Sequence, residues 1–126
     1  MIKIEKTIFG GNCAVFRNDQ IINNNCGVIL PNGNIVLKEM FDDIMYSVGD
    51  WAIVSVRFSK YMHSDLIYYG IIDKNMHIVI DPLSKEYFGY EGYLEIEEYL
   101  RNLYEEKYGM NSKIKKRLVR TLNNGK

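Results

Sequence analysis

The sequence is poor in the residue types that most often carry catalysis and metal binding. Its 126 residues include two cysteines, Cys13 and Cys26, two histidines, His63 and His77, and one tryptophan. The separation of 13 between the cysteines fits no common zinc pattern, and neither a Cys-x-x-Cys pair nor a His-Glu-x-x-His motif occurs. The Gly-Gly pair at 10–11 is too short for a phosphate loop, and no Lys-Ser or Lys-Thr follows it. We therefore predict no catalytic residue, no metal site and no cofactor.

Long hydrophobic runs are also missing. No window approaches the ~18 consecutive apolar residues of a membrane-spanning helix. The first six residues, MIKIEK, contain no apolar stretch of the kind found in a signal peptide. We therefore expect a cytoplasmic protein with no membrane partner and with both cysteines as free thiols. An intrachain disulfide stays open if the chain is exported by another route.

The charge is balanced overall but unevenly distributed. The chain has 16 basic and 16 acidic residues. Residues 1–92 and 93–109 each carry a net charge of −3, and residues 110–126 carry +6. A basic end of this kind either forms an interaction tail or packs beside the acidic segment that precedes it. Because the body of the chain is acidic, general nucleic-acid binding is not favoured.

Two segments resemble each other at a separation of 43 residues. Residues 27–37 read GVILPNGNIVL, and residues 70–80 read GIIDKNMHIVI. Upstream, GNCAV at 11–15 resembles GDWAI at 49–53, and residues 92–96 could begin a third copy. Similarity at a fixed period is typical of repeat proteins, whose units stack to bury a shared core. We therefore predict tandem units of about 40 residues, each made of two β-hairpins in series.

Turn residues divide each predicted unit into strands. Asn32-Gly33 lies between two apolar runs and favours a type I′ turn, whereas Met76 disfavours positive φ and predicts a longer or bulged turn. Residues 51–58 and 66–72 are rich in β-branched and aromatic side chains and predict two paired strands. A polar and aromatic loop at 59–65 joins them. Its counterpart in the first copy lies near 18–19 or at 23–25.

The last third of the sequence changes to helical spacing. Apolar residues recur at 96, 100, 103, 104 and 108, Gly109 then ends this helix, and Ser112 is placed to cap a second helix. The sequence therefore predicts one domain, 1–126, of the α+β class and mainly β. Antiparallel β-hairpin repeats over residues 11–92 are followed by one or two C-terminal helices over residues 93–122.

The repeated segments resemble a known family, the WG repeat. Its unit runs as an aromatic residue and Gly, a short strand, Asp-Lys-x-Gly, an apolar triplet and Pro. Residues 69–75 (YGIIDKN), with IVI at 78–80 and Pro82, are similar to it, as are residues 27–37 and 49–54. Tyr69 and Cys26 stand where the family has Trp, and Met76 stands for Gly. Over about residues 11–96 the resemblance implies a β-rich scaffold linked to protein interaction, with no catalytic residues.

Tyrosine is abundant, with ten in the chain, and it is enriched at interfaces because it offers contact area at low entropic cost. We expect Tyr69 to be a core residue and the tyrosines around the 59–65 loop to line a recognition surface. The predicted protein-binding residues are charged or aromatic side chains from this region: Arg57, Tyr61, His63, Asp65, Tyr87, Tyr90 and Glu91.

Three functions follow from these features. The first is a non-catalytic module that binds another protein, similar in size and composition to bacterial immunity proteins, which occlude a basic toxin domain. The second is a small-molecule or nucleotide binder that uses Arg57 and the loop aromatics. The third is an enzyme using His63 with Asp65, which we rank last. Open hairpin edges could also pair two copies into a homodimer.

Overall fold

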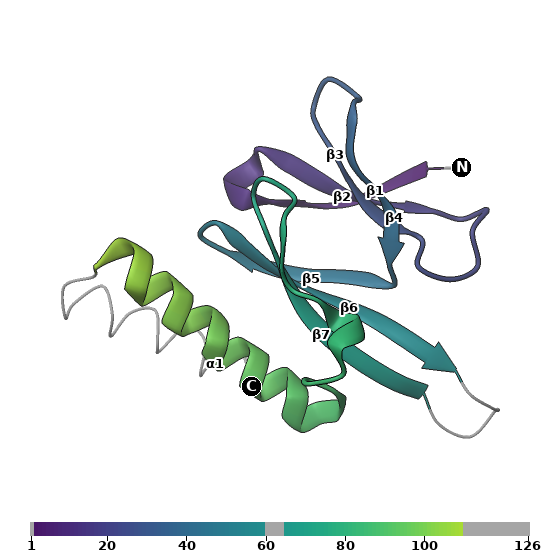
Figure 1. Cartoon of the computed structure of the whole chain (residues 1–126). Coiled ribbons are helices and arrows are strands. Elements are labelled where there is room, and N and C mark those ends of the chain that lie inside the picture. The colour runs from purple at the N-terminus through teal and green to yellow at the C-terminus, as the bar shows by residue number, and fades with distance from the viewer. Residues whose placement is uncertain (1, 60–64, 110–126) are drawn as a thin grey trace.

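The computed structural model describes residues 2–59 and 65–109 and contains two four-stranded antiparallel sheets followed by one helix (Figure 1). The N-terminal sheet has the order β1-β2-β3-β4, and the C-terminal sheet has the order β5-β6-β7-β8. The N-terminal sheet consists of β1 (Ile2–Ile8), β2 (Cys13–Asn18), β3 (Cys26–Ile29) and β4 (Ile35–Phe41). The C-terminal sheet consists of β5 (Asp43–Val48), β6 (Trp51–Ser59), β7 (Asp65–Asp73) and β8 (Ile78–Ile80). The prediction of a mainly β, α+β fold is confirmed.

The two sheets repeat each other down to their irregularities. The β1–β2 ladder skips Glu5, pairing Ile4 with Phe16 and Lys6 with Val15. The β5–β6 ladder skips Met45 in the same way. The β3–β4 and β7–β8 ladders also share one shift in register, at positions 43 residues apart. Bulges are specific features of a strand pair, so their coincidence shows that the two sheets are equivalent units.

The two short turns of the units have the same geometry, which differs from the predicted type I′ turn. The Leu30 carbonyl accepts from the Gly33 amide, and Asp73 accepts likewise from Met76. Within these two turns, the residues with positive φ are Gly33 (φ 92°) and Met76 (φ 66°). This pattern is a three-residue loop ending in a left-handed residue. Pro31 explains the difference, because it has no amide to donate to Asn34 and so cannot close a type I′ turn over Asn32-Gly33, whereas its fixed negative φ suits the first central position of the observed turn.

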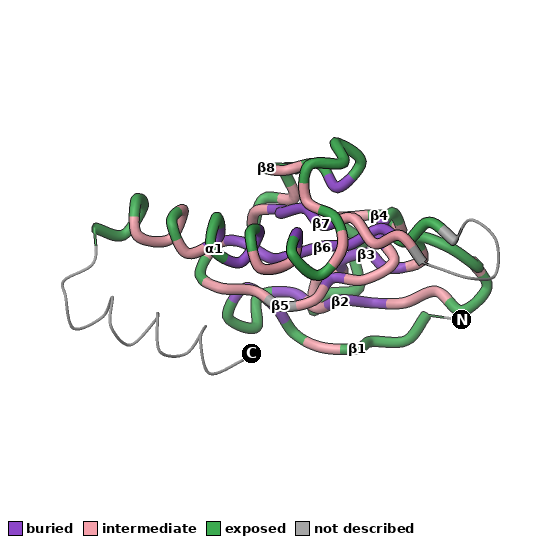
Figure 2. The backbone as a smooth tube through the Cα atoms, turned by 90° about the horizontal axis from the view of Figure 1, so that it is seen from below, coloured by how far each residue is buried: buried purple, intermediate pink, exposed green. Residues whose placement is uncertain are grey.

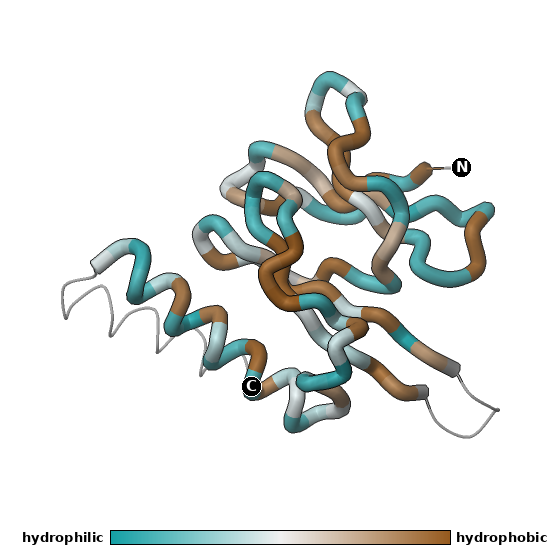
Figure 3. The backbone as a smooth tube through the Cα atoms, in the orientation of Figure 1, coloured by the Kyte–Doolittle hydropathy of each residue, from teal (hydrophilic) through white to brown (hydrophobic). Residues whose placement is uncertain are grey.

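The sheets are stacked face to face, and their apolar faces form the first of two cores. The alternation of a strand gives each sheet two faces. Val15 and Val28 of the N-terminal sheet lie in one buried cluster with Ile44, Val54 and Ile72 of the C-terminal sheet. Figure 3 shows the apolar stretches of β3 and β7 that contribute to this layer. Asp42 alone separates β4 from β5, so a single residue connects the two sheets.

The helix covers the opposite face of the C-terminal sheet. Helix α1 (Gly89–Tyr108) packs Ile96 and Leu100 against Trp51, Ile53 and Ile71, which form the second core. Gly109 ends α1 in the left-handed conformation, as predicted. The expected third repeat at residues 92–96 is wrong, since these residues lie within α1. The predicted second helix lies outside the described residues. Within those residues, no helix is long and apolar enough to cross a membrane.

A polar contact fixes the far end of α1 to the β5–β6 turn. The Asp50 carboxylate accepts a hydrogen bond from the Tyr108 hydroxyl (2.7 Å) and one from the Lys107 ammonium. Lys74 lies 3.5 Å from the other carboxylate oxygen. Hydrogen bonds from Lys107 and Tyr108 lower the pKa of Asp50 to about 2. The helix is therefore anchored at both its apolar face and its end.

Candidate protein-binding surface

A row of aromatic side chains lies at the end of the β6–β7 hairpin, beyond the edge of the first core. Phe58 and Tyr68 meet edge to face with ring centroids 5.4 Å apart, and Tyr68 meets Phe88 at 5.7 Å. Phe88 forms an isolated β-bridge with Tyr68, which places it beside β7. Its side chain is nevertheless 54% exposed. Contiguous exposed aromatics of this kind are typical of binding surfaces.

The strand alternation explains why this row is open to solvent. Phe58 lies on the same face of β6 as Val54 and Val56, which the N-terminal sheet buries. The hairpin extends further than that sheet, so Phe58 is left partly exposed. Phe88 caps the start of α1 with extended backbone, and Tyr90 follows in the first turn with 73% of its surface exposed.

Acidic residues follow this row along the start of α1. Residues 86–100 contain five acidic residues and no basic one. Glu86, Glu91 and Glu95 are exposed, and Glu91 lies in the first turn of α1. Burial raises the pKa of Tyr87, and Glu86 and Glu95 nearby raise it further. We name the set the acidic–aromatic surface; its members are Phe58, Tyr68, Glu86, Phe88, Tyr90, Glu91 and Glu95.

The structure brings together only some of the predicted binding residues. Tyr90 and Glu91 belong to the acidic–aromatic surface, while Tyr87 is half-buried and packs its ring against the second core. Tyr61 and His63 lie outside the described residues. Asp65 begins β7 opposite Ser59, and its side chain is not described. Phe58 and Phe88 were missed, because a phenylalanine beside a strand pattern predicts a core position.

Arg57 occupies a different site from the aromatic row, because it points to the other face of β6. It lines a cavity of about 360 Å³ beside the β2–β3 loop. Arg57 lies near enough to Tyr69 to oppose the rise in the pKa of Tyr69 that burial causes. The charged residues of the cavity wall are two arginines and two aspartates: Arg17, Arg57, Asp42 and Asp43. Their formal charges cancel.

Asp42 shapes this cavity by binding backbone amides. Its carboxylate accepts from the amide of Arg57 (2.5 Å) and from the amide of Asn24 (3.0 Å). These bonds tie the β2–β3 loop to β6 across the junction of the two sheets. Of the adjacent carboxylates Asp42 and Asp43, the first is thus committed to the backbone.

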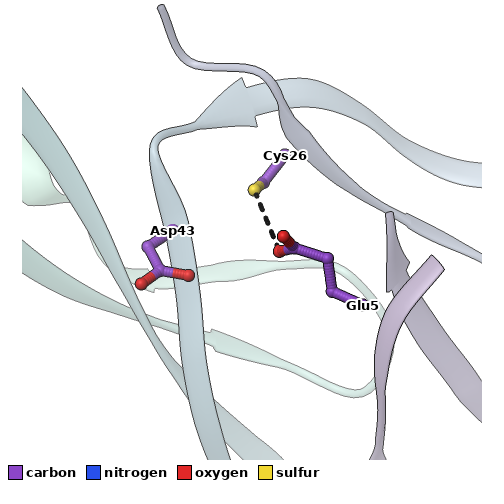
Figure 4. A group of neighbouring side chains, drawn as sticks. All are labelled: Glu5, Cys26 and Asp43. Carbon is purple, nitrogen blue, oxygen red and sulfur yellow. Dashed lines mark hydrogen bonds between the residues drawn. The ribbon is translucent and has the colours of Figure 1, made fainter. Parts of the chain in front are cut away.

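Glu5, Cys26 and Asp43 converge beside the cavity, with their ligand atoms within 4.8 Å of one another (Figure 4). Arg17 already pairs with both carboxylates of this group, since its guanidinium lies 2.9 Å from Glu5 and 3.8 Å from Asp43. Burial, more than the nearby charges, raises the pKa of the Cys26 thiol to about 11. Metal binding needs a thiolate, so the arrangement suits a structural ion pair rather than a metal centre.

Comparisons with known proteins provide no relative. No family model matches the chain, no curated protein matches it, and no solved structure matches it. The resemblance to WG repeats therefore stays a prediction, based on the residues quoted above and on the two equivalent sheets.

Proposed function

We propose that this protein is a non-catalytic binding module that holds a basic partner protein through the acidic–aromatic surface. The observation that carries the proposal is the row of Phe58, Tyr68 and Phe88, whose two outer rings are exposed, with the exposed Tyr90 two residues further along the chain. Rigid aromatic side chains provide most of the binding energy in many interfaces, and they do so from the centre of the contact.

The local charge beside the aromatic row supports a basic partner. The whole chain is neutral, but residues 86–100, which include Phe88 and Tyr90, contain five acidic residues and no basic one. The carboxylates beside the aromatic row would attract a cationic surface, speed its association and set its orientation. The kind of partner we propose is a basic toxin domain, which the module would neutralise by covering its active surface, as an immunity protein does.

The test is affinity capture with the full chain as bait and with defined variants. We expect a stoichiometric partner, retained by wild-type protein and lost with the double variant Phe88→Ser, Tyr90→Ser. The matched control is Ile22→Ser, which removes a side chain that is 92% exposed in the β2–β3 loop. The idea fails if no stoichiometric partner is captured, or if the double variant retains it fully.

Charge reversal provides a second test of the same surface. Glu91→Lys with Glu95→Lys should weaken capture and reduce its dependence on salt, because these carboxylates would lie at the rim of the contact. The matched control reverses the same number of charges: Asp19→Lys with Glu106→Lys, at two exposed positions outside the acidic–aromatic surface. Equal loss in both variants would mean that only the net charge matters, which contradicts a localised surface.

A second candidate is a small planar ligand in the cavity beside Arg57. The cavity volume of about 360 Å³ favours it, although an anionic ligand would meet Asp42 and Asp43 as well as the arginines. Thermal unfolding with a nucleotide panel tests it, because a ligand at 100 times its Kd should add about 2.7 kcal/mol to the stability. Arg57→Ala should remove any such shift. No shift across the panel would exclude nucleotides.

A further inference from the structure

The two equivalent sheets leave one apolar face without a cover. We call the two faces of each sheet A and B. Face B of the N-terminal sheet, with Val15 and Val28, covers face A of the C-terminal sheet. Face B of the C-terminal sheet is covered by α1 through Ile96 and Leu100. Helix α1 therefore takes the place that a following unit would occupy, as a terminal cap does in repeat proteins.

Face A of the N-terminal sheet has no such cover in the described residues. The shared ladders make Ile4 equivalent to Ile44, since Ile4 pairs with Phe16 as Ile44 pairs with Val54. The Ala14–Ile29 pair of β2 and β3 is likewise equivalent to the Ala52–Ile72 pair of β6 and β7.

Burial differs sharply between these equivalent positions. Ile44, Ala52 and Ile72 are fully buried, each at 0% exposure. Ile4 is 59% exposed, and Ala14 and Ile29 are only half-buried. Figure 2 shows the same contrast, with most of β1 exposed along one side of the molecule. Phe16 on the same face is an exception: it is fully buried, like its equivalent Val54, and its ring lies against Gly27. At the other three positions the side chains are of the same apolar kind, so the difference there comes from the missing layer.

The uncovered face contains a groove without charged lining residues, while Glu39 accepts a hydrogen bond from Asn18 at the end of the face. This groove of about 380 Å³ is lined mostly by apolar atoms from the two hairpins: Ile4, Thr7, Ala14, Ile29, Leu30 and Pro31. Ile2, two residues before Ile4 on β1, and Ile35, paired with Ile29 on β4, add further exposed apolar surface. No Lys, Arg, Asp or Glu lines the groove.

We infer that face A of the N-terminal sheet binds face A of a second copy of this chain, giving a two-fold symmetric dimer. Such a contact requires a surface complementary to itself. The uncharged groove meets this requirement, because a two-fold axis through the groove brings no like charges of its lining together. Inside the chain, face A of the C-terminal sheet is covered by small or branched side chains, Cys13, Val15 and Val28. Ile4, Ala14 and Ile29 of a second copy are side chains of the same kind and could cover face A of the N-terminal sheet in the same way.

This inference is separate from the proposed function, because it concerns face A of the N-terminal sheet, whereas the acidic–aromatic surface lies on the C-terminal sheet and α1. The dimer would present two acidic–aromatic surfaces to its surroundings. Edge pairing of hairpins, the route to a dimer expected from sequence, uses backbone groups and does not need Ile4. Substitution of this side chain therefore distinguishes the two routes.

Sedimentation velocity over protein concentrations of about 1–500 μM tests the inference with the full chain. We expect wild type to pass from monomer to dimer, and Ile4→Asp to raise the dimer Kd at least about tenfold, because the carboxylate would be buried against apolar surface. Thr7→Glu on the same groove should act alike, which guards against a local effect of one substitution. Ile22→Asp, which places the same charge at an exposed loop position, should dimerise like wild type.

Several outcomes would overturn the inference. One is wild-type protein that keeps the monomer mass across the whole range. Another is a dimer whose Kd is unchanged in both Ile4→Asp and Thr7→Glu, with circular dichroism showing that both variants are folded. A dimer lost in the Phe88→Ser, Tyr90→Ser variant but kept in Ile4→Asp would assign the contact to the acidic–aromatic surface instead.

Discussion

Gly27 and Gly70 occupy the same place in the two sheets, and each lies beneath a carbonyl oxygen of the next strand. A methyl group on Gly27 would lie 2.3 Å from the Leu37 carbonyl oxygen, and one on Gly70 would lie 2.3 Å from that of Ile80. The four residues are related by the separation of 43. Close approach of the backbone therefore explains why glycine occurs at both positions, since any side chain would push the neighbouring strand away.

The first prediction concerns this pair of glycines. Gly27→Ala and Gly70→Ala should each lower the free energy of unfolding by about 2–3 kcal/mol, because a buried strand must shift to admit the methyl group. Urea denaturation measures the effect. Gly33→Ala is the control: its φ is 92° but no atom lies within 4 Å of the added carbon, so only backbone strain of about 1 kcal/mol remains. Equal losses at all three positions would contradict the steric explanation.

The second prediction concerns Met76, which holds φ 66° at the place where the first unit has Gly33. Met76→Val should destabilise the protein by about 2 kcal/mol, because a β-branched side chain fits the left-handed region poorly. Met76→Gly should stay within about 1 kcal/mol of wild type, since relief of strain offsets the lost packing against the first core. Thermal denaturation distinguishes the two variants, and a Val variant as stable as the Gly variant would refute the argument.

The hairpins could be predicted because their signals are local. Alternating β-branched residues and turn residues at 27–37 and 70–80 specified two strands and a turn in each unit. The first turn type was missed because Asn32-Gly33 was given more weight than Pro31. The prediction of a third copy beginning at Gly92 was wrong for a similar reason. Gly92 lies near the start of α1 and packs against the Tyr87 backbone, and the neighbouring residues in the sequence do not indicate this role.

The candidate surface depends on contacts between elements that are far apart in the sequence, and no local sequence pattern predicts such contacts. Tyr90 and Glu91 were found because exposed aromatic and acidic residues predict recognition. Phe58 follows the alternation of a buried strand, and its exposure arises only because the N-terminal sheet ends earlier than the β6–β7 hairpin. Arg57 was assigned to the same surface as the tyrosines, yet alternation places it on the other face of β6, toward the cavity.

The third prediction concerns the contact between Asp50 and the end of α1. The pKa of Asp50 is lowered to about 2 in the folded protein, below its unfolded value of about 3.9. Its contribution to stability is therefore fully present above about pH 4 and is lost as the pH falls toward 2. Asp50→Asn should destabilise the protein at pH 7 by an amount of the order of 1 kcal/mol. The difference from wild type should shrink as the pH approaches 2.

Urea denaturation of both proteins at pH 7 and pH 2.5 measures this change. Asp19→Asn is the matched control, because Asp19 pairs only with Lys3 in an exposed ion pair, 3.3 Å apart, and should alter stability little at either pH. A destabilisation by Asp50→Asn that is the same at both pH values would mean that the carboxylate charge is not what anchors the helix.

The fourth prediction concerns the two thiols. Cys13 and Cys26 are buried, burial raises the pKa of both, and that of Cys26 reaches about 11. At pH 8 only ~0.1% of the Cys26 thiol is then ionised, and the thiolate is the reactive form. Native protein should therefore react negligibly with a disulfide reagent at pH 8, and two thiols should react once the chain is unfolded. Ile22→Cys provides the control, since a thiol in that exposed loop position should react at once in the native protein. Rapid reaction of a native thiol that persists in Cys13→Ser and disappears in Cys26→Ser would show that Cys26 is activated rather than buried, and the Arg17 network would then be a reactive site.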